Sequence, residues 1–291
     1  MNKCFVTRLN GSSNNSELLR LGEMRMKILK VENPTDHTQG FSLECNKPTI
    51  LEIVSDGYFT DKTLTENKGK NITLNVGNNN IWVNGNNDVE IAILDKYSLY
   101  AIKRYYQGEQ QSMIYGKNIK INFSDLKYSI ALTSLVLADT QISGDIANLK
   151  ELTALTSLSL SNTQIPLTGD ISELSALSKC TEMSIRNSKL TGDLATLPAL
   201  CRFVSFLNDK GSAFTWSTRP STAKIIAIEG NARLTNIDKM LQDQAQCQVG
   251  FSSNNAPLYK TISVTGNRTS ASDAAVTTLQ QKGYTISIAK A

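Results

Sequence analysis

The tripeptide Gly-Asp-Ile or Gly-Asp-Leu occurs three times in the chain, starting at Gly144, Gly169 and Gly192, with spacings of 25 and 23 residues. Each copy follows a short segment that resembles a Leu-x-Leu strand. This periodicity predicts a repeat protein in which each unit supplies one strand and a short return, and in which neighbouring units stack. The feature constrains the fold more than the function, because one repeat architecture can carry many activities.

The segments around these tripeptides fit the pattern L-x-x-L-x-L-x-x-N/C-x-L of a leucine-rich repeat. The four first repeats contain Leu132, Leu135, Leu137, Thr140 and Ile142; Leu155, Leu158, Leu160, Thr163 and Ile165; Cys180, Met183, Ile185, Ser188 and Leu190; and Cys201, Val204, Phe206 and Asp209. Looser copies contain Ile226, Ile228 and Asn231; Val249, Phe251 and Asn254; and Ile262, Val264 and Asn267. The step from Asn254 to Asn267 is only 13 residues, so either the Val249 segment is not a strand or the coil is irregular there.

The polar residues of these repeats have structural explanations. A Thr, Ser, Asp or Asn after each strand can pair backbone groups that the turn buries. Glycine permits a tight turn with positive φ, and the following Asp is suited to cap a short return helix. Asp170 and Glu173 also have the spacing of a capping box. We therefore interpret the Gly-Asp pairs as parts of the fold.

The sequence predicts a mixed α/β chain in which an antiparallel, sandwich-like β-domain precedes a leucine-rich-repeat solenoid. Short alternating runs separated by Asn-Gly and similar turns occupy residues 23–118, after an arm of residues 1–22. Ile91 to Ile93 lies two periods before Leu135, so its strand could cap the repeats without a linker. Residues 119–291 form the repeat domain, which ends in a β-α-β cap with a helix over 270–282.

Composition and charge exclude several classes of protein. The chain is 40% hydrophobic, carries a net charge of +4 and has no Lys/Arg run longer than two, which does not favour nucleic-acid binding. We find no apolar leader and no stretch long enough to cross a membrane, so we expect neither signal-dependent export nor membrane insertion. The five cysteines are scattered and lack metal-site spacing, which predicts reduced thiols in the core and no cofactor.

The outward strand positions give the first candidate binding site, on the expected concave face. They are Ser134, Val136 and Ala138; Ser157, Ser159 and Ser161; Glu182, Ser184 and Arg186; and Phe203, Ser205 and Leu207. A small polar surface of this kind lets a partner backbone or a glycan approach closely, with Glu182 and Arg186 as charged contacts. A plain solvated sheet is the alternative.

Two aromatic groups are further candidates. The tyrosines Tyr97, Tyr100, Tyr105 and Tyr106 lie near Lys96, Lys103 and Arg104, a composition that suits an interface or the junction of the two domains. Phe203, Phe206, Phe214 and Trp216 surround the least regular repeat, and we expect them to be mostly core.

Enzyme chemistry has little support in the sequence. His37 is the only histidine and lies in a polar segment, so a Ser-His-Asp or Cys-His arrangement would have to converge on it. Phosphate-binding glycine loops and histidine metal motifs do not occur. A glycosidase that uses two carboxylates stays open as a minor alternative, because Asp and Glu are plentiful. We therefore predict a protein that is not an enzyme.

Several segments resemble leucine-rich-repeat proteins of gut Bacteroidetes and of phages that infect them, including crAss-like phages. They are the opening Met1 to Gly11 and Leu21 to Arg25, the repeats Ile142-Ser-Gly-Asp-Ile and Leu167-Thr-Gly-Asp-Ile, and the ending Ser272-Asp-Ala-Ala with Lys282-Gly-Tyr-Thr-Ile. The resemblance implies an oligomeric virion or tail-fibre component whose N-terminal part attaches to other virion proteins and whose repeats bind a host protein or glycan. The lack of a signal fits localisation in the virion. A bacterial surface adhesin is the alternative.

Overall fold

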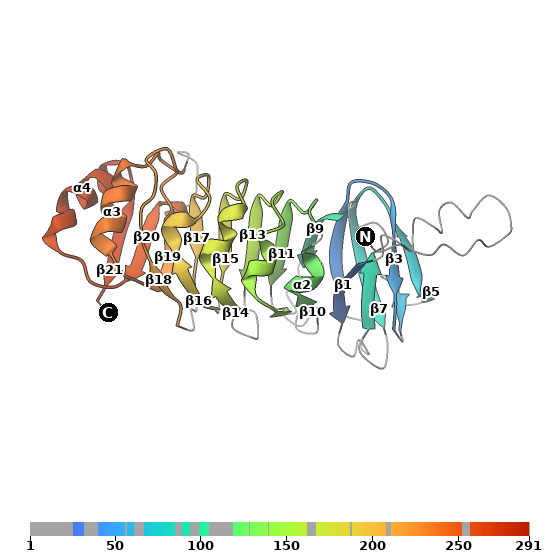
Figure 1. The fold of residues 1–291 in the computed structure, drawn as a ribbon. Helices are drawn as coiled ribbons and strands as arrows, with labels where there is room; N and C mark the ends of the chain where they lie inside the picture. Colours follow the sequence, from blue (N-terminus) through green and yellow to red (C-terminus); the bar gives the residue numbers. More distant parts are fainter. Residues whose placement is uncertain are drawn as a thin grey trace, which may run out of the picture.

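The chain forms an elongated molecule dominated by β-strands, with few helices (Figure 1). The computed structural model describes residues 26–31, 40–55, 57–60, 67–84, 89–93, 99–104, 119–127, 129–138, 140–161, 167–186, 188–207, 211–251 and 257–290. Its strands form two large sheets, so the mixed α/β class is correct in broad terms. The predicted arm of residues 1–22 lies outside the described residues, and the predicted domain boundaries stay predictions.

The N-terminal half contributes antiparallel strands to both sheets. One sheet contains β1 (Met26–Val31), β3 (Thr49–Ile53), β6 (Asn71–Leu74), β8 (Val89–Ile93) and β10 (Ile119–Asn122). The other contains β2 (Gly40–Cys45), β4 (Tyr58–Thr60), β5 (Asn67–Gly69), β7 (Gly77–Asn84) and β9 (Leu99–Arg104). Strand β3 alternates buried and half-buried residues, as a strand with one core-facing side must. Apolar residues of both sheets join one hydrophobic cluster that continues into the C-terminal half.

The C-terminal half is organised around a row of parallel strands, which we call the parallel ladder. It comprises β11 (Ser134–Ala138), β13 (Ser157–Ser161), β15 (Glu182–Ile185), β17 (Phe203–Ser205), β19 (Ala227–Leu234), β20 (Thr261–Thr265) and β21 (Thr285–Ala289). Equivalent positions of the predicted repeats pair across it, in the order Leu135, Leu158, Met183, Val204, Ile228, Ile262 and Ile286. The pairing confirms the alignment from Leu135 to Ile228 and the place of Ile262 in a ladder strand, whereas the repeat expected at Val249 is missing between them.

A second row of shorter strands and return helices closes the coils. The strands are β12 (Gln141–Ser143), β14 (Leu167–Asp170), β16 (Ser188–Asp193) and β18 (Ala213–Thr215). The returns are the short α-helix α2 (Phe123–Leu126) and the 3-10 helices η2 (Ile146–Leu149), η3 (Ile171–Ala176) and η4 (Leu194–Thr196). The long strands and the turns were predicted from the sequence. The strands of this second row were not.

The Gly-Asp turns have the geometry that was expected. Gly144, Gly169 and Gly192 have φ of 97°, 124° and 105°, and the aspartate after each caps a 3-10 helix by accepting a backbone N–H. The Asn122 side chain caps α2 in the same way, by accepting the backbone N–H of Ser124. This cap was not predicted from the sequence. Glu173 forms an ion pair with Lys150 of the preceding coil, with Nζ and Oε2 3.2 Å apart.

The junction between the two halves differs from the expected one. Ile91 and Ile93 lie in β8, which belongs to the six-stranded sheet and does not pair with the ladder. Strand β9 makes that connection instead, because Ile102 pairs in parallel with Leu135. Strand β10 likewise pairs in parallel with β12. Both N-terminal sheets therefore continue into the repeat coils without a break in hydrogen bonding.

The C-terminal coils are irregular because a helix is inserted between two ladder strands. Helix α3 (Ile237–Gln246) follows β19, and the Val249 segment forms no ladder strand; nearby Gln248 makes only an isolated bridge. A 3-10 segment η5 (Pro257–Lys260) then leads into β20. The expected terminal helix is present as η6 (Ser270–Ser272) and α4 (Asp273–Gln281), between the parallel strands β20 and β21. The unusually short step of 13 residues from Asn254 to Asn267 therefore arose because the Val249 segment was wrongly predicted to be a strand.

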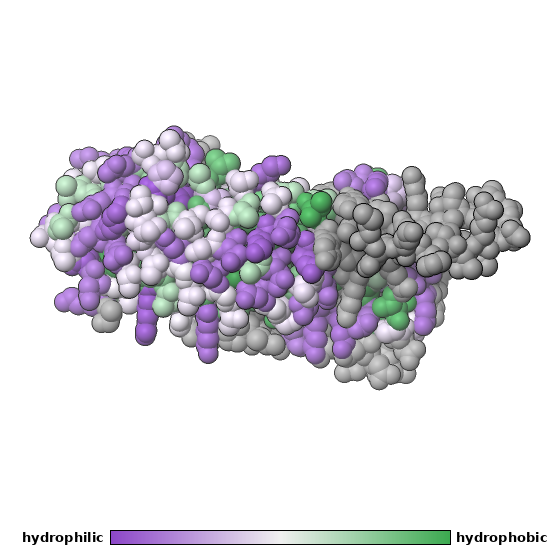
Figure 2. Space-filling view, viewed as in Figure 1, coloured by the Kyte–Doolittle hydropathy of each residue, from purple (hydrophilic) through white to green (hydrophobic). Residues whose placement is uncertain are grey.

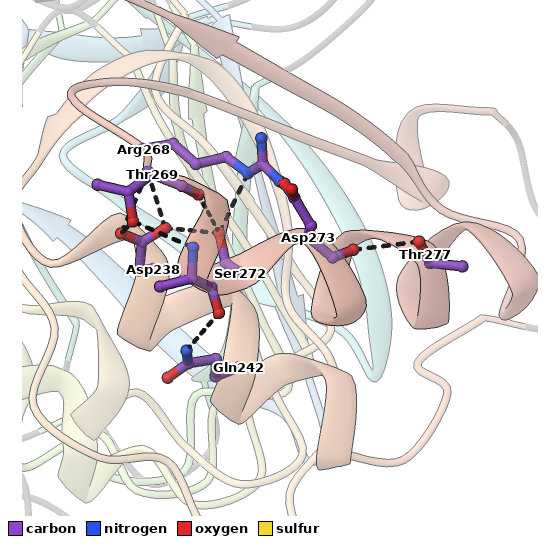
Figure 3. A network of polar contacts seen from close by, with 8 residues as sticks. Asp238, Gln242, Arg268, Thr269, Ser272, Asp273 and Thr277 are labelled. Atoms are coloured by element: carbon purple, nitrogen blue, oxygen red, sulfur yellow. Dashed lines mark hydrogen bonds and ion pairs between the residues drawn. The ribbon is translucent and has the colours of Figure 1, made fainter.

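A polar network fastens α3 to the start of α4 (Figure 3). The Asp238 carboxylate accepts hydrogen bonds from the backbone and hydroxyl of Thr269 and from the Ser272 hydroxyl. Arg268 donates to Ser272 and pairs with Asp273. These hydrogen bonds lower the pKa of Asp238, the bond from Ser272 most of all.

Candidate binding face

Alternation along the ladder strands gives the molecule one solvent-facing side, which we call the ladder face. Leu135, Leu158 and Met183 point inward and are buried, so their neighbours in each strand point outward. Strand register places the outward residues in two rows. The first row is Ser134, Ser157, Glu182, Phe203 and Ala227, and the second is Val136, Ser159, Ser184, Ser205 and Glu229. Both rows are covered at β17, where Ser205 is fully buried although it was expected on the exposed face, and Ala227 of β19 is buried as well.

The structure brings the first predicted site together. Ser157, Ser159, Glu182, Ser184 and Arg186 are all half-buried on or beside the ladder face. Ser161 ends β13, and its side chain lies outside the described residues, as does that of Ala138. Among the described residues, the side of the molecule shown in Figure 2 is mostly purple or white, and green appears only in small areas.

Glu182 lies at the centre of a charged and aromatic cluster on this face. Its Oε1 accepts from Arg202 Nη2 at 2.6 Å, and its Oε2 accepts from the Tyr259 hydroxyl at 3.0 Å. The Tyr259 ring lies 5.0 Å from the ring of Phe203, and the Arg202 guanidinium is 5.8 Å from the Tyr259 centroid. Burial, followed by the bond to Glu182, raises the pKa of Tyr259, so this phenol stays protonated and donates.

Arg186 and Glu229 form a second, looser pair next to this cluster. Glu229 Oε2 accepts from the buried Ser205 hydroxyl at 2.7 Å, whereas Arg186 Nη2 is 3.8 Å away. The Nε atoms of Arg186 and Arg202 are buried and have no hydrogen-bond partner among the described residues. These two Nε–H groups are covered, so a partner could reach the two guanidinium groups only at their exposed ends; each side chain is 34% exposed.

Sequence reasoning missed three members of this site. Tyr259 contacts Glu182 across 77 residues, from a segment that breaks the repeat period, so no spacing signals the contact. Arg202 directly precedes β17 and occupies none of the repeat positions that the sequence pattern singles out. Glu229 occupies an outward position of the fifth repeat, and extending the rows of outward residues to that repeat would have found it.

The aromatic candidates have different outcomes. Tyr97, Tyr105 and Tyr106 lie outside the described residues; Tyr100 belongs to β9, and its side chain is not described. The core interpretation is confirmed for Phe206, Phe214 and Trp216, which are at most 1% exposed. Phe203 was also expected on the outward face, but it is only 7% exposed and packs against the Tyr259 ring.

The chemistry of the described residues is that of hydrogen bonding and ion pairing. Within the described ranges, no group of three or more His, Cys, Asp or Glu side chains is placed to hold a metal ion. The helices of these ranges are too short or too polar to cross a membrane. Cys45, Cys180, Cys201 and Cys247 are buried and in no disulfide, which confirms the expected core thiols for these four.

No family model matches the chain, and the search of curated proteins finds no match.

Proposed function

We propose that this chain is a leucine-rich-repeat protein that binds a partner through its ladder face and is not an enzyme. The in-register strands and the stacked Gly-Asp turns support the leucine-rich-repeat part of this proposal. The cluster around Glu182 supports the binding part, because it places charged and aromatic groups among small serines. Arginine and tyrosine on such a surface are the residue types that carry binding energy in known interfaces.

The observation that carries the proposal is the state of Arg186. Its Nη2 lies 3.8 Å from the Glu229 carboxylate, which is a loose ion pair, and its side chain is 34% exposed. A guanidinium with free donors suits carboxylate, phosphate or hydroxyl acceptors of a partner. The neighbouring serines leave room for a peptide backbone or a glycan to approach.

The proposed setting is a virion, as a tail-fibre or other surface component that attaches by its N-terminal part and presents the repeats to the host. The resemblance of the opening, the repeats and the ending to proteins of Bacteroidetes phages supports this setting. Mass spectrometry of purified phage particles and of host outer-membrane fractions from one culture tests it. We expect the intact chain in the particles; recovery from the host membranes alone would instead favour the bacterial adhesin.

The binding surface is tested with the purified protein as a competitor of particle adsorption to host cells. We expect Arg186→Ala to weaken competition by roughly tenfold to a hundredfold, the usual effect of truncating a central interface residue. Lys189→Ala is the matched control, because Lys189 is exposed on β16, in the second row of strands. Equal competition by both variants would remove the ladder face as the binding surface.

The attachment role of the N-terminal part has its own test. Deleting residues 1–22 should prevent incorporation into particles and leave the far-ultraviolet circular dichroism of the repeats unchanged. Normal incorporation of the shortened chain would contradict this role.

A further inference from the structure

The ladder face carries two ion pairs that differ in how closely their charges meet. Arg202 Nη2 and Glu182 Oε1 lie 2.6 Å apart, whereas Arg186 Nη2 and Glu229 Oε2 lie 3.8 Å apart. Both arginine side chains are 34% exposed, so solvent exposure does not explain the difference. A separation of 3.8 Å is too long for a hydrogen bond. Arg186 is therefore attracted by a carboxylate without donating to it at that distance.

Glu229 is held in place by a different donor. Its Oε2 accepts from the Ser205 hydroxyl at 2.7 Å, and Ser205 is fully buried on β17, the strand between β15 and β19. The carboxylate keeps this hydrogen bond when Arg186 turns to another acceptor. Glu229 is thus an internal competitor for Arg186 that an external anion can displace without leaving the carboxylate unpaired.

Arg202 is already engaged and does not offer the same opportunity. Glu182 accepts from both Arg202 and the Tyr259 hydroxyl, and the Arg202 guanidinium lies 5.8 Å from the centroid of the Tyr259 ring. An external acceptor would have to replace a charge-assisted hydrogen bond and disturb the cation–π contact. Of these two arginines, Arg186 is the one that an anion can engage at lower cost.

The burial of one nitrogen restricts how a ligand approaches Arg186. Its Nε is covered, so the guanidinium can be engaged only end-on, through its two Nη groups. A carboxylate presents two coplanar oxygens that match such a pair of nitrogens. A neutral hydroxyl presents one acceptor without charge, which competes poorly with the Glu229 carboxylate. The site therefore selects a ligand that carries a carboxylate.

The surroundings of Arg186 favour a sugar over a polypeptide as the carrier of this carboxylate. Half-buried Ser157, Ser159 and Ser184 place hydroxyl groups on β13 and β15, and hydroxyls can donate to and accept from those of a sugar. Protein interfaces are instead anchored by apolar or aromatic side chains that become buried at their centre. Phe203 cannot serve as such an anchor, because it is only 7% exposed and packs against Tyr259.

We propose that the ladder face binds an acidic glycan, and that Arg186 holds the carboxylate of one sugar end-on in place of its loose contact with Glu229. The Glu229 carboxylate stays bonded to Ser205. This inference rests on the binding role proposed for the ladder face, and it names the class of ligand.

The probes are two uronate polymers, polygalacturonate and hyaluronate, each compared with its methyl ester. The ester keeps the sugar backbone and removes the negative charge of the carboxylate. Binding to the purified full chain is measured by bio-layer interferometry, with polyglutamate of similar length as the polypeptide probe. We expect at least one uronate polymer to bind about tenfold or more tightly than its ester and than polyglutamate.

Three substitutions test the exchange at Arg186. Glu229→Gln removes the competing charge but keeps an oxygen for the Ser205 hydroxyl, so affinity for the bound uronate polymer should rise about twofold to fivefold, the range expected for an exposed ion pair. Glu173→Gln is the matched control and should have no effect, because it removes the same charge from an exposed pair with Lys150 at the return helix η3. Arg186→Ala should weaken binding about tenfold or more. Thermal melting confirms that each variant is folded.

Failure of this inference can be told apart from failure of the proposed function. The acidic glycan is overturned by no binding of either polymer, by equal binding of polymer and ester, or by polyglutamate binding as tightly. It is also overturned by unchanged binding of Arg186→Ala, or by no gain for Glu229→Gln over Glu173→Gln. If Arg186→Ala still weakens competition for particle adsorption, the ladder face binds a ligand of another class. Equal competition by Arg186→Ala and Lys189→Ala would remove the binding surface itself.

Discussion

The buried guanidinium of Arg219 organises the irregular part of the repeats. Its side chain is 3% exposed, and it donates to backbone carbonyls rather than to a carboxylate. The acceptors are the carbonyls of Ala195, Leu197, Pro198, Cys201 and Lys224, at 2.9 to 3.3 Å. A planar group with five donors is the one side chain that can satisfy so many carbonyls at once.

Replacing Arg219 should therefore be strongly destabilising. Arg219→Met leaves several buried carbonyls without donors, and each unsatisfied group costs about 1–3 kcal/mol. We expect the free energy of unfolding in urea to fall by at least about 3 kcal/mol. Arg233→Met, at an exposed position, is the control and should change it by less than about 0.5 kcal/mol. A small effect of Arg219→Met would mean that water replaces the guanidinium.

Gly192 is required both for its backbone conformation and for the space that it leaves. Its φ is 105°, and a Cβ there would lie 1.8 Å from the Asp170 carboxylate of the preceding coil. Gly211 has a similar φ of 117° but nothing within 4 Å of a Cβ. We expect Gly211→Ala to cost about 1–2 kcal/mol for the conformation alone. Gly192→Ala should cost about 1–3 kcal/mol more, in urea unfolding, because Asp170 must move; equal costs would show that Asp170 moves freely.

The cysteines at the repeat starts should be unreactive in the folded protein. Burial raises the pKa of Cys180 to about 12 and that of Cys201 to about 11. At pH 8 the thiolate fraction of Cys201 is then on the order of one in a thousand. We expect peptide mapping after iodoacetamide treatment to show no label at either residue until urea is added. Labelling of Cys180 or Cys201 in the native protein would indicate local opening of these coils.

At the scale of elements, helix α3 is held to its neighbours by two carboxylates. Asp238 accepts from Thr269 and Ser272 at the start of the terminal helix (Figure 3). Asp243 accepts from the Trp216 indole at 3.0 Å and also pairs with Lys239. Burial by itself would raise the pKa of Asp243, but the hydrogen bonds outweigh it and the pKa is lowered. Both carboxylates therefore stabilise the fold in their charged form.

This arrangement predicts a loss of stability in acid. A folded pKa below the ordinary value of 3.8 means that the contribution of Asp238 is complete above about pH 4 and disappears as the pH falls through the folded pKa. Asp238→Asn lacks this contribution at every pH. We expect the difference in urea midpoint between the native protein and Asp238→Asn to be constant from pH 7 to pH 5 and to shrink below pH 4. A difference that persists at pH 2 would show that the negative charge of Asp238 is not what stabilises the fold.

The sequence predicted the elements that repeat and missed those that interrupt the repeat. Counterparts of Leu158, Gly169 and Asp170 recur every 21 to 25 residues, so their strand, turn and cap could be placed from the period. Helix α3 has no such signal, and the Val249 segment was mistaken for a strand although the chain is helical just before it. The candidate binding face was predicted in part: Glu182 lies on a regular strand and Arg186 directly follows it, whereas Tyr259 reaches the face from the interrupted coil.

At the scale of the whole molecule, the two halves share sheets and core. Strands β9 and β11 pair in parallel, as do β10 and β12, and one hydrophobic cluster runs through both halves. Two independent domains would be joined by a linker that few contacts cross. The hydrogen bonding at this junction instead resembles that between neighbouring coils of one repeat array, in which adjacent units stabilise each other.

The halves should therefore unfold together. The chain has two tryptophans, Trp82 in β7 and Trp216 in the C-terminal half, so Trp216→Phe and Trp82→Phe each leave one reporter. Because the β9 and β11 pairing would be broken by unfolding either half, we expect coincident urea transitions by fluorescence of the two variants and by circular dichroism of each. Each fluorescence midpoint is compared with the circular-dichroism midpoint of the same variant, so a stability change caused by the substitution affects both values equally. Fluorescence midpoints that differ while the circular dichroism shows two steps would establish separate domains with a boundary near residue 118.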